Sequence, residues 1–69
     1  MQPQHKIGLK FIRNYGNRKD VETITDILTT RNSKNEVIEI AYLTEHNFLG
    51  QMITTRTPGA TIARSNIIL

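Results

Sequence analysis

The stretch Val21–Thr57 constrains the fold more than any other part of the chain. It holds eight of the nine threonines, with Ile, Val and Tyr between them. Polar residues interrupt it at Asn32–Asn35 and again between Asn47 and Gly50. β-branched and aromatic residues suit a pleated surface, whereas clusters of Asn, Ser and Gly mark turns. The pattern therefore predicts a meander of short antiparallel strands.

Alternation of apolar and polar residues, together with the turn residues, sets the expected strand boundaries. The predicted strands are Lys6–Ile12, Val21–Arg31, Val37–Glu45 and Gln51–Thr57. The segment Arg13–Asp20 is expected to be a loop, and Pro58-Gly59 a turn. The segment Thr61–Ala63 fits either a last short strand or a 3₁₀ turn.

One of these strands has an alternative interpretation. In Val21–Arg31, the residues Val21, Ile24, Ile27 and Leu28 also fit helical spacing, and Asp20 could serve as the N-cap. Four threonines within eight positions favour a strand, because β-branched residues lose rotamer freedom in a helix. Asp26 is expected at a bulge or a sheet edge.

Length and composition indicate one small domain. Sixty-nine residues allow a single core, and without cysteine neither a disulfide nor a cysteine-based zinc site can stabilise it. We expect an all-β fold, a small SH3-like barrel of four to five strands over residues 6–69, preceded by a flexible N-terminus, residues 1–5. A five-stranded barrel of the OB type fits a chain this short less well. The aromatic and apolar side chains expected in the core are Phe11, Tyr42, Phe48, Leu49 and Ile53.

The charges are unevenly distributed along the chain. Residues 1–19 carry five positive charges and no acid, and residues 20–45 carry six acids against Arg31 and Lys34. Such asymmetry indicates an anionic partner, or charges that pair across the sheet. Tyr15, in a polar loop, is the better candidate for stacking on a base, since Tyr42 is expected in the core. The candidate anion-binding residues are Lys6, Lys10, Arg13, Tyr15, Arg18, Lys19 and Arg64.

Catalytic and metal-binding motifs are not recognisable in the sequence. His46 is expected to be a turn histidine at a strand end and His5 a solvated residue, so neither predicts a metal site. No base stands beside a serine or threonine in a pattern that marks a nucleophile. We expect a protein that is not an enzyme and needs no cofactor or metal. The apolar runs are far shorter than the roughly 20 residues that cross a bilayer, so we expect no membrane association and a cytoplasmic location.

The chain ends in the apolar run Ile67-Ile68-Leu69. An exposed apolar end gains nothing from water, so it should be covered. Two arrangements achieve this: the run closes the open end of its own barrel, or it contacts another subunit of a homo-oligomer.

Several short motifs resemble a group of small uncharacterised proteins of tailed bacteriophages and prophages. They are TDILTT at 25–30, NSKNEV at 32–37, Tyr42, HNFLGQ at 46–51 and TIAR at 61–64. The resemblance covers residues 20–65 and leaves the basic N-terminus outside it. It implies a phage accessory protein in the cytoplasm of an infected bacterium, and it assigns no functional residue.

Three functions remain open at this point. The first is a non-enzymatic phage accessory protein that binds a host factor, of the host-takeover or anti-defence type, as a homo-oligomer. The second is an anion-binding module for nucleic acid or a small nucleotide signal, including a cyclic one. The third is a structural part of the virion.

Overall fold

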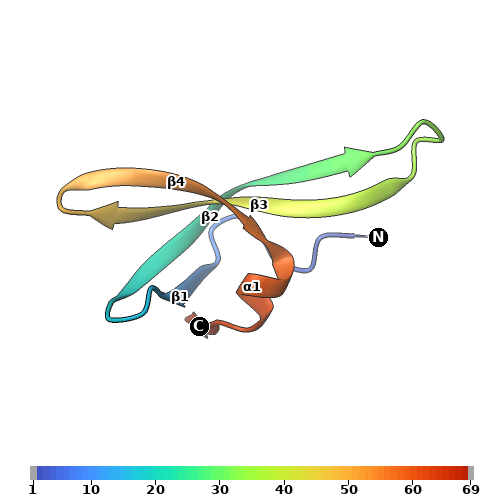
Figure 1. The fold of residues 1–69 in the computed structure, drawn as a ribbon. Coiled ribbons are helices and arrows are strands. Elements are labelled where there is room, and N and C mark those ends of the chain that lie inside the picture. Colours follow the sequence, from blue (N-terminus) through green and yellow to red (C-terminus); the bar gives the residue numbers. More distant parts are fainter. Residues whose placement is uncertain (1, 69) are drawn as a thin grey trace.

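The computed structural model describes residues 2–68 and consists of one curled antiparallel sheet with a single short helix (Figure 1). The strands are β1 (Lys10–Asn14), β2 (Lys19–Arg31), β3 (Val37–Phe48), β4 (Gln51–Pro58) and β5 (Asn66–Ile68), and the helix is α1 (Gly59–Ala63). Their order in the sheet is β4-β3-β2-β1-β5. The all-β prediction is confirmed, and SH3-like topology stays a prediction. Within residues 2–68, no helix has the length and apolarity that crossing a membrane requires.

The long strands β2 and β3 form the centre of the sheet. Residues 21–31 are a strand, as predicted, with Ile24 opposite Thr44 and Ile27 opposite Tyr42. The register shifts between Ile24 and Asp26, which confirms the expected bulge. The predicted turn at 32–35 is also confirmed. There the Asn32 side chain accepts the N–H groups of Lys34 and Glu36 at 2.9 and 3.0 Å.

The first strand begins four residues later than predicted. Lys6–Leu9 form a turn, closed by the Leu9 N–H that donates to the Lys6 carbonyl at 3.1 Å. Gly8 has φ +94°, a value that glycine adopts readily and that breaks the strand conformation. Ile7 is therefore 60% exposed instead of facing the core. The predicted loop at 13–20 is correspondingly shorter, because Arg13 pairs with Asp20 and Asn14 with Lys19 across β1 and β2.

The strand β3 continues to Phe48, three residues beyond its predicted end. His46 is consequently a buried strand residue, and its assignment to a turn was wrong. The turn that follows is Leu49-Gly50, where both residues have positive φ (52° and 82°), as a tight two-residue hairpin requires.

The β3–β4 hairpin extends away from the body of the protein (Figure 1), so its apolar side chains have little to pack against. Leu49 is 87% exposed and Phe48 is half-buried, so the prediction of both as core residues was wrong. Ile53 is four residues before the buried Thr57, so both side chains point to the same face of β4. Ile53 lies near the uncovered end of that strand, however, and is exposed, so it is not a core residue. The buried inward side chain of β4 is Thr57.

The segment after β4 is neither a strand nor a 3₁₀ turn. Thr61–Ala63 belong to α1, which Pro58 precedes in extended conformation. Ile62 is fully buried and, with Phe11, Ile24 and Tyr42, forms the apolar core. Each of these four residues comes from a different element, β1, β2, β3 or α1. The core is therefore small and ties the helix to the sheet.

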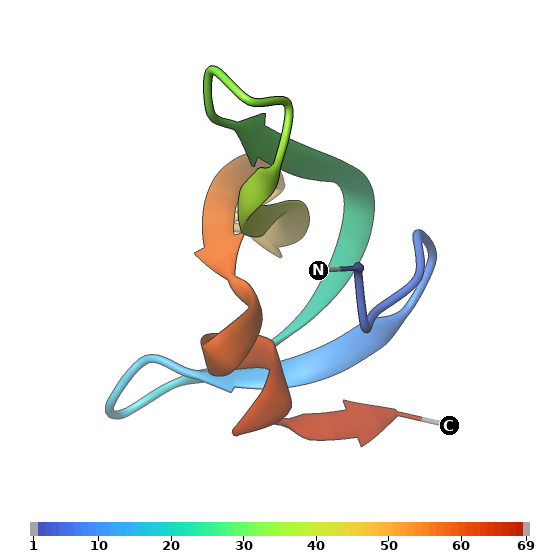
Figure 2. The same cartoon turned by 90° about the vertical axis from the view of Figure 1, so that its right-hand side faces the viewer.

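The C-terminal segment closes the sheet on the far side of β1. In β5, Asn66, Ile67 and Ile68 pair with Ile12, Phe11 and Lys10, and β1 and β5 lie side by side in Figure 2. Two residues of the predicted apolar tail are therefore part of the protein's own sheet. Leu69 lies outside the described residues.

The sheet curls around the N-terminal segment (Figure 2). The Gln4 N–H donates to the Tyr42 hydroxyl at 3.2 Å, and the His5 ring packs edge-on against Tyr42 with centroids 5.3 Å apart. The prediction of a solvated His5 was wrong, because that ring is half-buried against β3.

Candidate functional site

A buried acid, Glu22, organises the polar part of the protein interior. Its side chain is completely buried. Oε1 accepts a hydrogen bond from the Thr44 hydroxyl at 2.6 Å, and Oε2 accepts one from the Tyr15 hydroxyl. A buried carboxylate is costly unless it is hydrogen-bonded and its charge is compensated. Both conditions are met by residues of β1, β3 and the β1–β2 turn. The Glu22 cluster, as we use the term, comprises Arg13, Tyr15, Glu22, Thr44, His46 and Thr57.

A chain of donors links Glu22 to a cation. Arg13 Nη1 donates to Thr57 Oγ1 at 3.0 Å, and the hydroxyls of Thr57 and Thr44 lie 2.9 Å apart. Each hydroxyl has a single proton to donate. Since Thr44 donates to Glu22, Thr57 must donate to Thr44. The same Arg13 nitrogen lies 3.7 Å from Glu22 Oε1 and balances its charge.

Tyr15, the candidate for stacking on a base, is 37% exposed and has a partner within the protein. Its hydroxyl bonds to Glu22, and its ring lies 5.4 Å from the His46 ring. Burial raises the Tyr15 pKa to about 12, and the hydrogen bond to Glu22 and the charge of that carboxylate act in the same direction. The phenol is consequently a stable proton donor near neutral pH.

His46 is the one member of the cluster without a complete set of partners. It is 6% exposed, and within residues 2–68 its Nδ1 has no hydrogen-bond partner. The nearest acceptor on an acid, Glu22 Oε2, is 3.9 Å away, beyond hydrogen-bond distance.

Arg18 covers the outside of this cluster. Its Nε lies 2.9 Å from Asp20 Oδ2, and its guanidinium stacks over the rings of Phe48 and Tyr15 at 4.2 and 5.2 Å. Arg13 and Arg18 therefore both pair with acids of the same protein. For these two arginines, the basic residues pair with acids across the sheet, which is the second of the two explanations given for the uneven charge distribution.

The other predicted anion-binding residues are dispersed. Lys19 begins β2 at the end of the β1–β2 hairpin, and Arg64 follows α1 as its C-cap. Lys6 and Lys10 lie elsewhere, together, at the N-terminal side of β1. The structure therefore does not gather the seven candidates on one surface.

The two lysines meet the apolar C-terminus in an open hollow. It has a volume of about 560 Å³ and is lined mainly by two short segments, Lys6–Lys10 and Ile67-Ile68. We call it the β5 hollow. It exists because β1 and β5 are antiparallel, with Lys10 opposite Ile68, so the chain's basic start and apolar end come together. Candidate anion-binding and subunit-contact residues thus share one site.

The β5 hollow is lined by apolar residues and by two exposed lysines, Lys6 and Lys10, which we call the rim lysines. Ile7, Ile67 and Ile68 are 60%, 37% and 40% exposed. The Lys10 Nζ donates to Thr23 Oγ1 at 2.8 Å, and Thr23 belongs to β2, on the other side of β1 from β5. β5 is also an edge strand, with no strand beyond it among the described residues. The site therefore offers backbone donors and acceptors, apolar side chains and positive charge within one small surface.

Reasoning from the sequence named Lys6, Lys10, Ile67 and Ile68 but did not bring them together, and it missed Glu22. Glu22 could have been recognised, because it is separated by two positions from the core residue Ile24 and must share its face of the strand. The β5 hollow had no local signal, since it depends on the pairing of segments almost sixty residues apart. Within residues 2–68, no group of three His, Cys, Asp or Glu side chains could hold a metal ion.

Comparisons of the chain with protein families, with curated proteins and with solved structures found no match.

Proposed function

We propose that this protein is a non-enzymatic binding module whose partner adds an extended, acidic segment to the edge of β5. The resemblance of residues 20–65 to phage proteins supports the further proposal that it is a phage accessory protein and that the partner is a host factor. The observation that carries the binding proposal is the coincidence of a sheet edge, an apolar hollow and two lysines.

A free strand edge has an intrinsic affinity for another strand. Its unpaired N–H and C=O groups can bond to an added strand, and alternate side chains of that strand enter adjacent pockets. β5 has only three residues, so backbone bonds alone give a short contact. The apolar surface of Ile7, Ile67 and Ile68 supplies the remaining contact area beside it.

The charge at the rim selects the kind of partner. Lys6 and Lys10 favour a segment with Asp or Glu next to its apolar residues. A second copy joined edge to edge through β5 would supply Asn66–Ile68, a strand that contains no acid, so it would leave both lysines without a counter-charge. We therefore propose a different protein with an acidic segment, and not a symmetric dimer, at this edge.

A titration with a designed peptide tests this proposal. The probe is a short peptide that alternates Glu with Val, and the matched negative peptide alternates Lys with Val. We expect the Glu peptide to shift the amide NMR signals of Lys6–Lys10 and of β5, and the Lys peptide to shift neither. Equal binding of both peptides, or shifts confined to other strands, would refute the charge selection.

Variants of the protein extend the same test to cell lysate. The double variant Lys6→Gln, Lys10→Gln should lose both the peptide and any host protein captured by the wild type. The matched control is Lys34→Gln, in the exposed β2–β3 turn, which should retain both. A captured protein that binds the double variant as well as the wild type would count against the site.

The two rim lysines also favour a second candidate, binding of an anion such as an oligonucleotide or nucleotide. Two phosphate contacts to a single strand give a salt slope of about −1.4 in log K against log salt. A slope near zero would exclude it. Amide exchange separates the two candidates, since an added strand protects the outer amides of β5 and an oligonucleotide does not.

A further inference from the structure

The sheet has a second free edge, on the strand β4 at the opposite side from β5. β4 is the first strand in the order β4-β3-β2-β1-β5, and among residues 2–68 no strand lies beyond it. It has eight residues, against three in β5. In Figure 1 it borders the hairpin that extends from the body of the protein. β4 therefore offers the longer of the two edges to an added strand.

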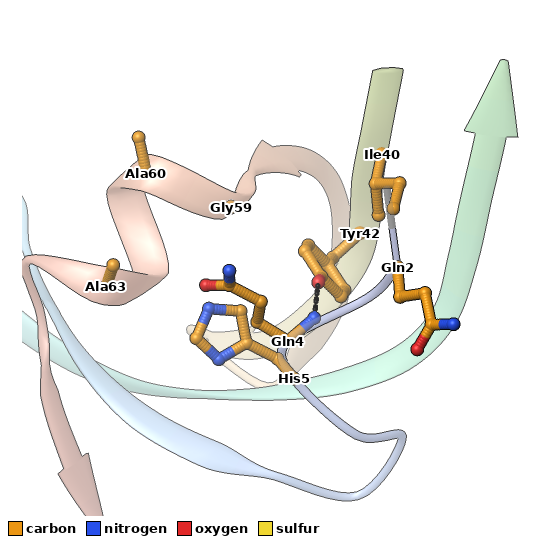
Figure 3. A pocket seen from close by; sticks show the side chains of 8 residues that line it. All are labelled: Gln2, Gln4, His5, Ile40, Tyr42, Gly59, Ala60 and Ala63. Carbon is orange, nitrogen blue, oxygen red and sulfur yellow. Dashed lines mark hydrogen bonds between the residues drawn. The ribbon is translucent and has the colours of Figure 1, made fainter. Parts of the chain in front are cut away.

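One end of β4 is covered by the rest of the protein and the other is not. Thr57 is buried, opposite Tyr42 of β3. The N-terminal segment and α1 lie beside that tyrosine, as Figure 3 shows, and α1 also contacts β4. Residues 51–54, at the other end, are all exposed. The free part of the edge is therefore the half of β4 that follows the Leu49-Gly50 turn.

This turn determines which backbone groups of β4 face outward. In a two-residue hairpin the flanking residues, here Phe48 and Gln51, exchange both backbone hydrogen bonds, and bonded pairs then alternate along the strands. Every second residue from Gln51 on therefore bonds to β3, and the Thr55 carbonyl also accepts the Thr44 hydroxyl on that side at 3.3 Å. The residues whose N–H and C=O groups face the free edge are Met52, Thr54 and Arg56.

The exposed half of β4 lacks the features that usually prevent strand addition. Natural edge strands are protected by lysine, proline or inward-pointing charges. Residues 51–57 contain one charged residue, Arg56, and the only proline of β4 is its last residue, Pro58. Two of the apolar side chains, Met52 and Ile53, are 62% and 36% exposed. The β5 edge differs, because the rim lysines lie beside it.

A second copy of the same strand is complementary to this edge. With a two-fold axis at Thr54, the middle of residues 51–57, Thr54 of one copy lies opposite Thr54 of the other. Opposed threonines form a favourable cross-strand pair. Met52 then lies opposite Arg56 of the second copy. The two arginines are roughly 14 Å apart along the paired strands, farther than the screening length at physiological salt, so they do not oppose the pairing.

The same arrangement offers each arginine an acid of the other copy. Glu45 lies opposite Thr54 on β3 and makes no ion pair among residues 2–68. From the strand spacing and the rise per residue, its Cα lies roughly 12 Å from that of Arg56 in the second copy. Arg56 has a similar reach within its own chain, since it pairs with Glu39, four residues along β3 from the opposing Leu43. Two copies would thus share two equivalent ion pairs.

We infer that this protein forms a symmetric homodimer through β4, with antiparallel pairing centred on Thr54. The two sheets join edge to edge, and because each copy uses its only β4 edge, assembly stops at two. The dimer covers Met52 and Ile53 and adds burial to a chain near the lower size limit for a single stable core. Both β5 edges stay free, so the inference is independent of the partner proposed there.

Sedimentation equilibrium of the full chain measures the dimer. The strand pair is smaller than a standard interface, so we expect a Kd on the order of 0.1 mM. Thr54→Lys places two lysines opposite each other and should raise the Kd at least about 10-fold. The matched control Thr30→Lys, at an exposed threonine of β2, should dimerise as the wild type does. Glu45→Gln should raise the Kd about 2- to 5-fold, since exposed ion pairs are weak.

Disulfide cross-linking tests the register. The chain has no cysteine, so Thr54→Cys introduces a single thiol per copy. An axis at this residue brings the two thiols within disulfide distance. We expect mild oxidation to yield the covalent dimer of Thr54→Cys at least about 10-fold faster than that of Lys34→Cys. Lys34 lies in the exposed β2–β3 turn, so its variant reports cross-linking by collision.

A protein that stays monomeric at about 1 mM, ten times the expected Kd, would overturn the inference. A dimer that survives Thr54→Lys, or one that Thr30→Lys disrupts equally, would overturn it as well. Equal cross-linking rates for Thr54→Cys and Lys34→Cys would contradict the register centred on Thr54. The double variant Lys6→Gln, Lys10→Gln should leave the Kd of the dimer unchanged, which separates this contact from the site at β5.

Discussion

The Glu22 cluster and the β5 hollow are both places where β1 meets another part of the chain, but they are built in opposite ways. The cluster is polar and centred on the buried Glu22, which accepts hydrogen bonds from Tyr15 and Thr44 and is balanced by Arg13. The hollow is open and apolar, with cations at its rim and a strand edge beside it. The acid, the phenol and the histidine of the cluster contact one another inside the protein. The surface for which we propose a partner has none of these groups.

The largest expected effect is on the cluster. Glu22→Ala removes the acceptor shared by Thr44 and Tyr15 and leaves Arg13 without its buried counter-charge. Breaking a buried ion pair in this way costs about 3 kcal/mol or more. For a chain of this length, the whole free energy of unfolding is about 3–10 kcal/mol. Urea unfolding should therefore show that the variant is largely unfolded without urea, or that its urea midpoint is far below that of the wild type. An unchanged urea midpoint would mean that the cluster is not structural.

A smaller effect is expected from Tyr15→Phe, which removes one hydrogen bond to a charged group. The loss should be about 1.5 kcal/mol, measured by urea unfolding at pH 7. The pH dependence gives an independent check. The folded-state pKa of Tyr15, about 12, lies above the ordinary value of 10, so its contribution is complete below pH 10 and is lost as the pH rises toward 12. The wild type should lose stability over that interval more steeply than Tyr15→Phe. Parallel pH profiles would contradict the bond.

The β5 hollow should respond in the reverse manner, with little change in stability and a large change in binding. Ile68→Ser alters a side chain that is 40% exposed, so the free energy of unfolding should fall by less than about 1 kcal/mol. Affinity for the alternating Glu-Val peptide should fall about 10-fold, measured by calorimetry. A large loss of stability with normal peptide affinity would show that Ile68 closes its own barrel instead of binding a partner.

The smallest effect belongs to the β3–β4 turn, which is part of neither region. Leu49 has φ +52° and is 87% exposed, so its conformation is strained and its side chain contributes no packing. Leu49→Asn should raise the thermal midpoint slightly, by an amount equivalent to about 0.5 kcal/mol. Peptide binding should stay at the wild-type level. A lower midpoint would indicate that Leu49 has a packing partner.

The sequence predicted those features that depend on neighbouring residues. The β-branched content identified β2 as a strand, and the polar residues identified the turn at 32–35. It failed where a single backbone conformation or a distant segment decides the outcome. Positive φ at Gly8 moved the start of β1, and at Leu49-Gly50 it allowed β3 to reach Phe48 before turning.

The same distinction, between features set by neighbouring residues and features set by distant segments, applies to the candidate sites. Period-two alternation places Glu22 beside Ile24, so a buried acid was predictable, although its partners on three other segments were not. Lys6 and Lys10 were recognised as candidate anion contacts, and Ile67 and Ile68 as candidate contacts with another subunit. That these four residues share one hollow depends on the β1–β5 pairing, which no local pattern indicates.

Amide hydrogen exchange in the presence of the alternating Glu-Val peptide tests the central claim most directly. If partners add to the edge of β5, the β5 amides that do not bond to β1 should exchange more slowly when the peptide is bound. Amides of the strands around Glu22 should exchange as in the free protein. Unchanged exchange at β5 would contradict the proposal that the hollow binds a partner. Protection that appears first around Glu22 would contradict the proposal that the cluster only stabilises the fold.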